Sequence, residues 1–346
     1  MRGAGDALRA AGVGAIYLVH GTFAGTDALG LFSALGRVFP GAAKLLRGLE
    51  KAIVDGVAGE NGNYTAEYAR LMENALCHGG APRIPVRLFH WSSENHHLGR
   101  ADAAVRLLDE LHAQELPAGQ RVILWGHSHA GNVFALLTNL LGADTDMRAR
   151  FFEAAQVYYR WPLFGWADIV VWDRIEKLLR REGSPLAGRS LDVVTFGTPI
   201  RYGWDAAGHA KLLHFVHHRP APGHAAHRAH FPLTVDEILN AEHGDYVQHF
   251  GIAGTNAMPP ILAWRAWRAD RNLHALLQPH LPPQGLLSRL KFGVRVADAG
   301  ESLLVDYGRT HESLLAHLAG HAVYTRREWL LFHTEEIVKR WYAATG

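Results

Sequence analysis

The stretch Gly126-His127-Ser128-His129-Ala130-Gly131 places a serine among small residues. A serine hydroxyl that acts as a nucleophile is held outward on a tight, strained turn, which leaves almost no room for bulk two residues before or after it. Gly126, Ala130 and Gly131 supply that room. The pattern is that of a nucleophile elbow, G-x-S-x-G, with alanine in the second glycine place, and Ser128 is the candidate nucleophile. The alternative is an ordinary strand–turn–helix whose small residues only allow close packing.

Serine needs a base, and where the nucleophile lies on a strand–turn–helix elbow the acid and then the base follow it along the chain. The base is therefore expected beyond the last strand and just ahead of the final helix, where His321 lies in Gly320-His321-Ala322. With 23 histidines in the chain, others compete. His311, His317 and His333 are the rivals. His317 and His333 are expected within helices, which limits how far their side chains can reach toward Ser128.

The acid is expected after the strand 212–216, yet its immediate successors contain no carboxylate. Asp245 is the first candidate, displaced by an insertion. Asp306, at the end of the last strand, is the second, and Asp236 the third. Asp245 also has another interpretation, as a turn-forming aspartate beside Gly244.

Negative charge that develops on a carbonyl oxygen needs fixed donors. The backbone amide of His129 directly follows the nucleophile at a helix N-terminus, and the amide of Thr22 lies in the loop after the first strand. Both are predicted oxyanion-hole donors. His20 is interpreted as a structural hydrogen-bonding residue of that loop. Such a site needs no cofactor.

Apolar runs and apolar spacing indicate the elements that must position these residues. Short apolar runs predict strands at 15–19, 86–91, 121–125, 191–196 and 212–216, and 291–296 with 302–307 resembles a hairpin. Helical spacing occurs at 100–111, 133–141 and about 326–341. Strands that alternate with helices predict an α/β fold with a doubly wound, mostly parallel sheet.

The composition limits the class of protein. The 346 residues are 48% hydrophobic and 20% charged, which predicts a globular chain that we take as one domain, 1–346. A net charge of +2 gives no reason to expect a nucleic-acid partner. Cys77, the single cysteine, suits a reducing cytoplasm. Neither a signal-peptide pattern nor a run of about 18 apolar residues occurs, so we expect a cytoplasmic protein without a transmembrane segment.

Two stretches interrupt the alternation of strands and helices. Residues 151–187 are rich in aromatic side chains, and they predict either a lid or cap insertion or a pair of amphipathic helices packed on the sheet. Residues 219–243 are rich in proline and histidine and predict a long loop insertion.

Two further patterns can each be interpreted either as a binding site or as ordinary structure. The histidines in and around the long loop could bind zinc, but they match no short zinc motif and include no cysteine, so a polar loop without metal is the preferred interpretation. These are His217, His218, His224, His227, His230, His243 and His249. The tryptophan–arginine segment 261–268 could rest on a lipid surface. An ordinary helix with arginines extending from a buried face is preferred.

Taken together, several of these motifs resemble the α/β-hydrolase superfamily, and most of all its lipases and esterases. They are His20-Gly21-Thr22, Gly126–Gly131, Thr195-Phe196-Gly197-Thr198-Pro199 and Gly320-His321. The Thr-Phe-Gly-Thr-Pro run is similar to that of class 3 triacylglycerol lipases, in which the acid follows as Asp-x-Val, and Asp245-Tyr246-Val247 matches that pattern. The resemblance covers about residues 15–341 apart from 151–187 and 219–243.

The resemblance implies a serine hydrolase that acts on a small-molecule or lipid ester with a triad of Ser128, Asp245 and His321. Thr22 and His129 would form its oxyanion hole. An amidase or thioesterase would use the same triad, and a non-catalytic binding protein could use the same scaffold. The oligomeric state is left open.

Overall fold

The structure is a computed structural model. It describes residues 1–21, 63–77, 80–114, 116–161, 168–181, 185–186, 188–230, 234, 237, 240–251, 256, 258–259, 263–277, 299–308 and 320–343.

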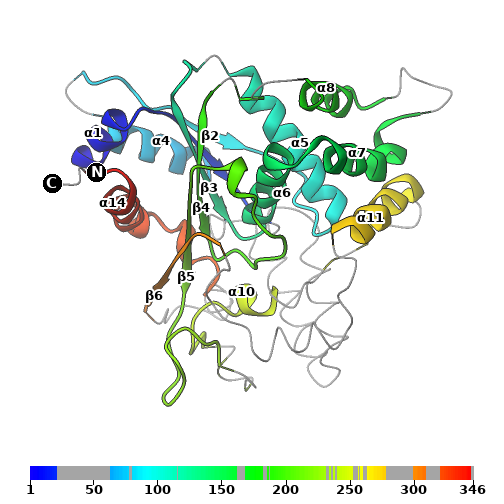
Figure 1. Ribbon diagram of the computed structural model, residues 1–346. Helices are drawn as coiled ribbons and strands as arrows, with labels where there is room; N and C mark the ends of the chain where they lie inside the picture. The colour runs from blue at the N-terminus through cyan, green and yellow to red at the C-terminus, as the bar shows by residue number, and fades with distance from the viewer. Residues whose placement is uncertain are drawn as a thin grey trace.

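A parallel β-sheet forms the centre of the described part of the chain (Figure 1). Its strands are β1 (Val13–Val19), β2 (Val86–Phe89), β3 (Arg121–His127), β4 (Ser190–Phe196), β5 (Lys211–His217) and β6 (Glu301–Val305). They lie in the order β2-β1-β3-β4-β5-β6, and every neighbouring pair is parallel. The predicted α/β class and parallel sheet are therefore confirmed.

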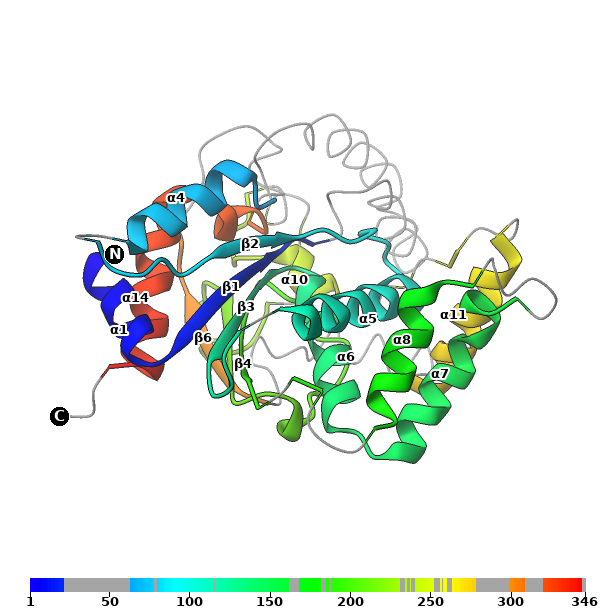
Figure 2. The same ribbon diagram turned by 90° about the horizontal axis from the view of Figure 1, so that it is seen from above.

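Helices cover both faces of this sheet (Figure 2). They are α1 (Arg2–Ala10), α4 (Ala66–Leu76), α5 (His97–Ala113), α6 (Ala130–Gly142), α7 (Thr145–Tyr159), α8 (Val170–Leu179), α10 (Tyr246–Gly251), α11 (Trp264–Leu277) and α14 (Leu330–Trp341). One face packs against α1, α4 and α14, and the other against α5 and α6. Helices α7, α8 and α11 pack outside α5 and α6.

Burial on both faces explains why the strands are continuous apolar runs. In β3, Val122 and Leu124 belong to the core under α5 and α6, whereas Ile123 and Trp125 belong to the core under α1, α4 and α14. Helix α6 is also buried nearly all round, since it lies between the sheet and the outer helices. Strand β3 precedes Ser128 and helix α6 follows it, so the serine is held between two rigid elements.

The strand order also defines where a ligand would bind. The chain leaves β1 for β2 on one side, whereas it leaves β3 for β4 on the other. In doubly wound sheets, ligands bind outside the carboxyl ends of the strands at such a switch point. The carboxyl ends of β1 and β3 carry Gly21 and Ser128, respectively.

Several local predictions need correction. The last helix begins at Leu330 rather than near Arg326, because the chain first makes two short 3-10 turns at Val323–Thr325 and Arg327–Trp329. Strand β6 pairs with β5 in parallel, and the hairpin of 291–296 with 302–307 stays a prediction, since 291–296 lies outside the described residues. Helices α1 and α4 were not predicted.

The aromatic stretch forms the two helices α7 and α8. They pack on each other and on α5 and α11 rather than directly on the sheet. Phe151, Phe152 and Trp172 are buried in the core between them. A lid role for residues 151–187 stays a prediction.

Candidate functional site

Ser128 occupies a tight turn between β3 and α6, in a backbone conformation that only glycine adopts easily. Its φ is +56°, in the left-handed region, where a side chain costs roughly 1–2 kcal/mol. The turn is held by its neighbours. The Ser128 N–H donates to the Phe196 carbonyl at 2.8 Å, and the Ser128 carbonyl accepts from the Gly131 N–H at 3.1 Å and from Thr198 Oγ1 at 2.7 Å. Strain of this kind persists only where the surroundings over-determine it, and it is enriched at functional sites.

The small residues around Ser128 are needed for space. A Cβ on Gly126 would lie 2.4 Å from the Phe134 ring, and one on Gly131 would lie 2.3 Å from Thr198 Oγ1. A Cβ on Gly21 would lie 2.5 Å from the Ser128 Cβ. The loop after β1 therefore touches the serine directly. Among the described residues, the buried Ser128 Oγ has no hydrogen-bond partner, so its hydroxyl is committed to no other structural role there.

Asp245 and His321 form a buried pair, although 76 positions separate them along the chain. His321 Nδ1 lies 2.7 Å from Asp245 Oδ2, and the two side chains are 3% and 0% exposed. A carboxylate only accepts, so Nδ1 carries the proton and Nε2 of the neutral ring has a lone pair. This is the tautomer that a general base requires.

Three donors hold Asp245 in place. Besides His321, the Tyr324 hydroxyl donates to Oδ2 at 3.0 Å and the Gln248 N–H donates to Oδ1 at 2.9 Å. The Asp245 N–H itself donates to the carbonyl of His217, the last residue of β5, at 3.0 Å. Hydrogen bonds to a carboxylate favour its charged form. These bonds thus fix Asp245 at the carboxyl end of the sheet and favour its carboxylate form.

His321 lies against the turn that carries Ser128. The ring of His127, the residue before Ser128, donates through Nε2 to the His321 carbonyl at 2.7 Å, and the two ring centroids are 4.6 Å apart. These contacts place His321 beside the residue that precedes Ser128.

The predicted oxyanion donors are described in part. The His129 amide stands at the start of α6, where the first N–H groups of a helix have no acceptor within the helix. Thr22 lies outside the described residues, but the adjacent Gly21 touches Ser128. The His129 ring is neutral, because burial, followed by the charges of Arg100 and Arg201, holds its pKa well below the usual value.

The rival candidates lie elsewhere or outside the described residues. Asp306 is 51% exposed at its side chain and pairs with Arg219 at 2.8 Å. His333 is buried in α14, where Nε2 lies 2.8 Å from the Tyr307 hydroxyl. Asp236, His311 and His317 are not among the described residues.

His20 takes part in a local hydrogen-bond network. Its Nδ1 lies 2.9 Å from the Gly21 carbonyl and 3.1 Å from the Ser93 hydroxyl, and its own carbonyl accepts from the Trp91 indole at 2.8 Å. Burial lowers the pKa of its ring. These contacts shape the loop that touches Ser128.

Sequence reasoning missed four residues that support the pair and the turn. They are His127, Thr198, Tyr324 and Gln248. One had a usable signal. Gln248 stands three residues after Asp245, which is the spacing at which one turn of helix brings groups together.

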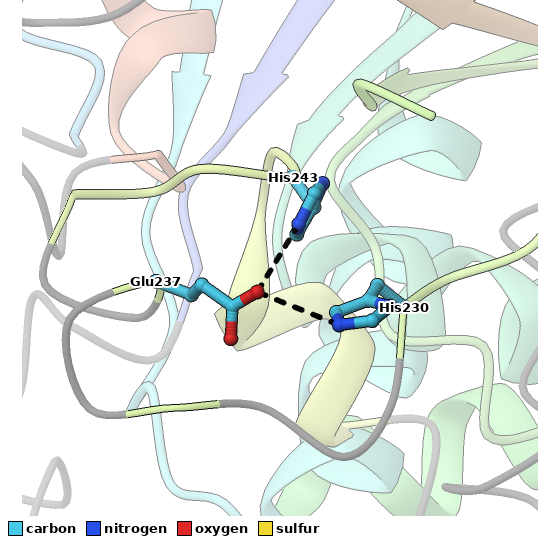
Figure 3. A group of neighbouring side chains, drawn as sticks. All are labelled: His230, Glu237 and His243. Atoms are coloured by element: carbon cyan, nitrogen blue, oxygen red, sulfur yellow. Dashed lines mark ion pairs between the residues drawn. The ribbon is translucent and has the colours of Figure 1, made fainter. Parts of the chain in front are cut away.

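The long loop brings together some of its histidines. His230 and His243 lie around the Glu237 carboxylate (Figure 3). His217 and His218 point to backbone carbonyls instead, those of Val305 and Ala226. Sequence reasoning noted the histidines but not Glu237.

Comparison with protein families, curated proteins and solved structures found no match to this chain. The resemblance to hydrolases therefore rests on the motifs and on the geometry above. None of the helices in the described part of the chain combines the length and the apolar character that a membrane span requires.

Proposed function

We propose that this protein is a serine hydrolase of the α/β-hydrolase fold that cleaves carboxylic esters with Ser128, His321 and Asp245. The observation that carries the proposal is the 2.7 Å bond between His321 Nδ1 and Asp245 Oδ2, with that imidazole packed against the residue before the strained Ser128. The order Ser, Asp, His along the chain matches the order in which α/β-hydrolases use these three roles.

In the proposed mechanism, Ser128 Oγ attacks the ester carbonyl carbon while His321 Nε2 takes its proton. The tetrahedral intermediate then collapses as His321 gives that proton to the leaving alcohol oxygen, which leaves an acyl-enzyme. Water attacks the acyl carbon by the same route, His321 returns a proton to Ser128 and the acid departs. Asp245 orients the ring and stabilises its charged form throughout.

Positive charge near the turn supports this chemistry. Burial first, and then the charges of Arg100 and Arg201, lower the pKa of the His129 ring, so the two arginines contribute positive charge at the turn. A tetrahedral intermediate carries a negative oxygen, and fixed positive charge and amide dipoles stabilise it. The amides of Thr22 and His129 are the proposed direct donors to that oxygen.

The first test is covalent labelling of the purified chain with a fluorophosphonate probe. We expect one adduct per chain, on Ser128 by peptide mass spectrometry, and none in Ser128→Ala. Hydrolysis of p-nitrophenyl esters should fall by about 10³-fold or more in that variant. A wild-type chain that takes up no label would leave a binding protein on the same scaffold as the explanation.

Substrate preference is the second test. Rates on p-nitrophenyl esters from acetate to octanoate, beside an anilide and a thioester of the same acyl group, separate the alternatives. We expect the octanoate ester to be favoured, because the resemblance to lipases implies a site for an apolar acyl chain. Faster anilide or thioester cleavage would indicate an amidase or a thioesterase, and a preference for acetate would contradict an apolar acyl site.

A further inference from the structure

Three side chains of the long loop point at one spot. His230 Nε2 and His243 Nε2 each lie 3.4 Å from Glu237 Oε1, and one ligand atom from each residue lies within 4.8 Å of the others (Figure 3). His243 is buried, and the other two are partly buried. We propose that His230, Glu237 and His243 bind a zinc ion that fastens this loop to the segment carrying Asp245.

The spacing fits an ion better than direct bonds. A charge-assisted hydrogen bond between an imidazole and a carboxylate is about 2.7–2.9 Å long. Zinc binds nitrogen and oxygen at about 2.0–2.2 Å in a tetrahedron, which sets neighbouring ligand atoms about 3.3–3.5 Å apart. Both observed nitrogen–oxygen separations of 3.4 Å lie in the second range.

The rest of the Glu237 carboxylate is already oriented. Its Oε2 accepts from the Thr234 N–H at 2.6 Å and from Thr234 Oγ1 at 2.7 Å, which leaves Oε1 to face the two rings. Outer contacts of this kind fix ligands at metal sites and tune their affinity. The His243 main chain is held as well, because its N–H donates to the Tyr246 hydroxyl at 3.2 Å.

The donor set narrows the choice of metal. Two imidazoles and one carboxylate suit zinc and other first-row transition metals, whereas calcium and magnesium prefer all-oxygen sites, and zinc is the ion that we propose. Three protein ligands leave one position of a tetrahedron for water or for a fourth side chain. His224 is a candidate, since its ring centroid lies 5.1 Å from that of His230.

The position of the site gives the metal a structural role. His243 is two residues before Asp245, and Gly244 between them forms an antiparallel β-bridge with His218, the residue after β5. A Cβ on Gly244, whose φ is +102°, would lie 2.4 Å from the His217 carbonyl. The backbone of this segment is therefore packed tightly against the main chain that leaves β5. Zinc would hold the same segment from the loop side. Its effect on catalysis rests on the function proposed above, but its binding does not.

The test uses the full chain, purified without a polyhistidine tag, stripped with a chelator and titrated with zinc against a chromogenic competitor. We expect one zinc per chain by mass spectrometry of the metal, a rise in Tm on zinc addition, and the visible bands of tetrahedral cobalt when Co²⁺ replaces it. Glu237→Gln and His243→Gln should weaken binding by more than about 100-fold. His227→Gln, an exposed histidine of the same loop, is the matched control and should bind normally.

Binding of less than one zinc at micromolar concentration by the folded wild-type chain would overturn the proposal, as would equal losses in the control. Near-UV circular dichroism shows which variants are folded. If His243→Gln does not fold, Glu237→Gln still tests the site, because glutamine keeps the shape of the glutamate side chain. Fluorophosphonate labelling separates the two proposals. If the chain binds zinc but takes up no label, the zinc site stands and the esterase proposal fails. If the chain takes up the label but binds no zinc, the esterase proposal stands and the zinc site fails.

Discussion

At the scale of single residues, the site depends on which carboxylate faces His321. Two aspartates had good sequence arguments, and the described structure separates them by environment. Asp245 is fully buried and holds three donors, whereas Asp306 is half exposed and pairs with Arg219. A buried carboxylate beside an imidazole fixes the tautomer of the ring, but an exposed ion pair contributes only about 0–1 kcal/mol.

The matched pair Asp245→Asn and Asp306→Asn tests this assignment. In Asp245→Asn the amide donates to Nδ1, so the ring presents a proton instead of a lone pair to Ser128. We expect kcat on a p-nitrophenyl ester to fall by about 10⁴-fold with little change in KM. Asp306→Asn should stay within about twofold of wild type, since only a surface pair is lost. A larger loss in Asp306→Asn than in Asp245→Asn would reverse the roles.

At the scale of elements, the loop after β4 connects the two halves of the site. Gly197 follows β4 with a φ of +58°, and a Cβ there would lie 2.6 Å from Asp245 Oδ2 and 2.4 Å from the Tyr324 ring. The next residue, Thr198, holds the Ser128 carbonyl. One short segment thus sets the position of both the nucleophile and the acid.

Gly197→Ala should therefore impair both stability and activity. We expect a loss of about 3 kcal/mol in the free energy of unfolding, from left-handed strain and from crowding together, and a lower kcat because Asp245 is displaced. Gly223→Ala is the control, since Gly223 has a φ of +80° but open space around it. It should lose only about 1 kcal/mol and keep its kcat. Urea denaturation gives both values, and equal losses would show that crowding is unimportant.

The sequence predicted the elements whose residues carry a strong local signal. Strands β3, β4 and β5 are mostly apolar because both faces are buried, and Ser128 stands out because its neighbours must be small. Helix α1 gave no such signal, because it packs through small residues. A Cβ on Gly5 would lie 2.0 Å from the Leu76 carbonyl of α4, so these helices touch where a bulky apolar stripe cannot fit.

Pairings between distant segments could not be predicted in the same way. Nothing local indicates that β6 pairs with β5, which lies more than 80 residues earlier in the chain. The acid was one of three candidates for the same reason, because residues 219–243 separate Asp245 from the strand that positions it. The Glu237 carboxylate became relevant only when the fold placed it between His230 and His243.

At the scale of the whole molecule, each face of the sheet buries a histidine. His214 lies on β5, where its Nδ1 meets the Thr195 hydroxyl at 2.6 Å, and His333 lies in α14 among the rings of Trp125, Phe196 and Phe215. Burial lowers the pKa of His214 to about 4 and that of His333 to about 3. Both imidazoles are therefore neutral in the folded protein at neutral pH.

This burial predicts that the protein is destabilised in mild acid. An unfolded chain binds protons at these histidines below a pH of about 6.5, but the folded chain does not until about pH 4 for His214 and about pH 3 for His333. The free energy of unfolding should thus fall as the pH drops from about 6.5 to 4, with up to about 2.7 kcal/mol per pH unit from the two groups.

Urea denaturation at several pH values between 7.5 and 4.5 measures that slope. His333→Gln should reduce it by up to half, since one of the two protons is removed, while His112→Gln, an exposed substitution, should keep the wild-type slope. A slope that His333→Gln leaves unchanged would mean that this ring is protonated equally in both states.

The layer formed by α1, α4 and α14 draws on both ends of the printed chain. During synthesis Trp125, Phe196 and Phe215 emerge well before α14, so their side of the sheet stays partly uncovered until α14 has been made. Until then one side of the sheet offers an aromatic surface to other nascent chains, which is the kind of surface that chaperones protect. A chain interrupted before Leu330 should accordingly collect in the insoluble fraction of a cell lysate, however complete its catalytic residues are.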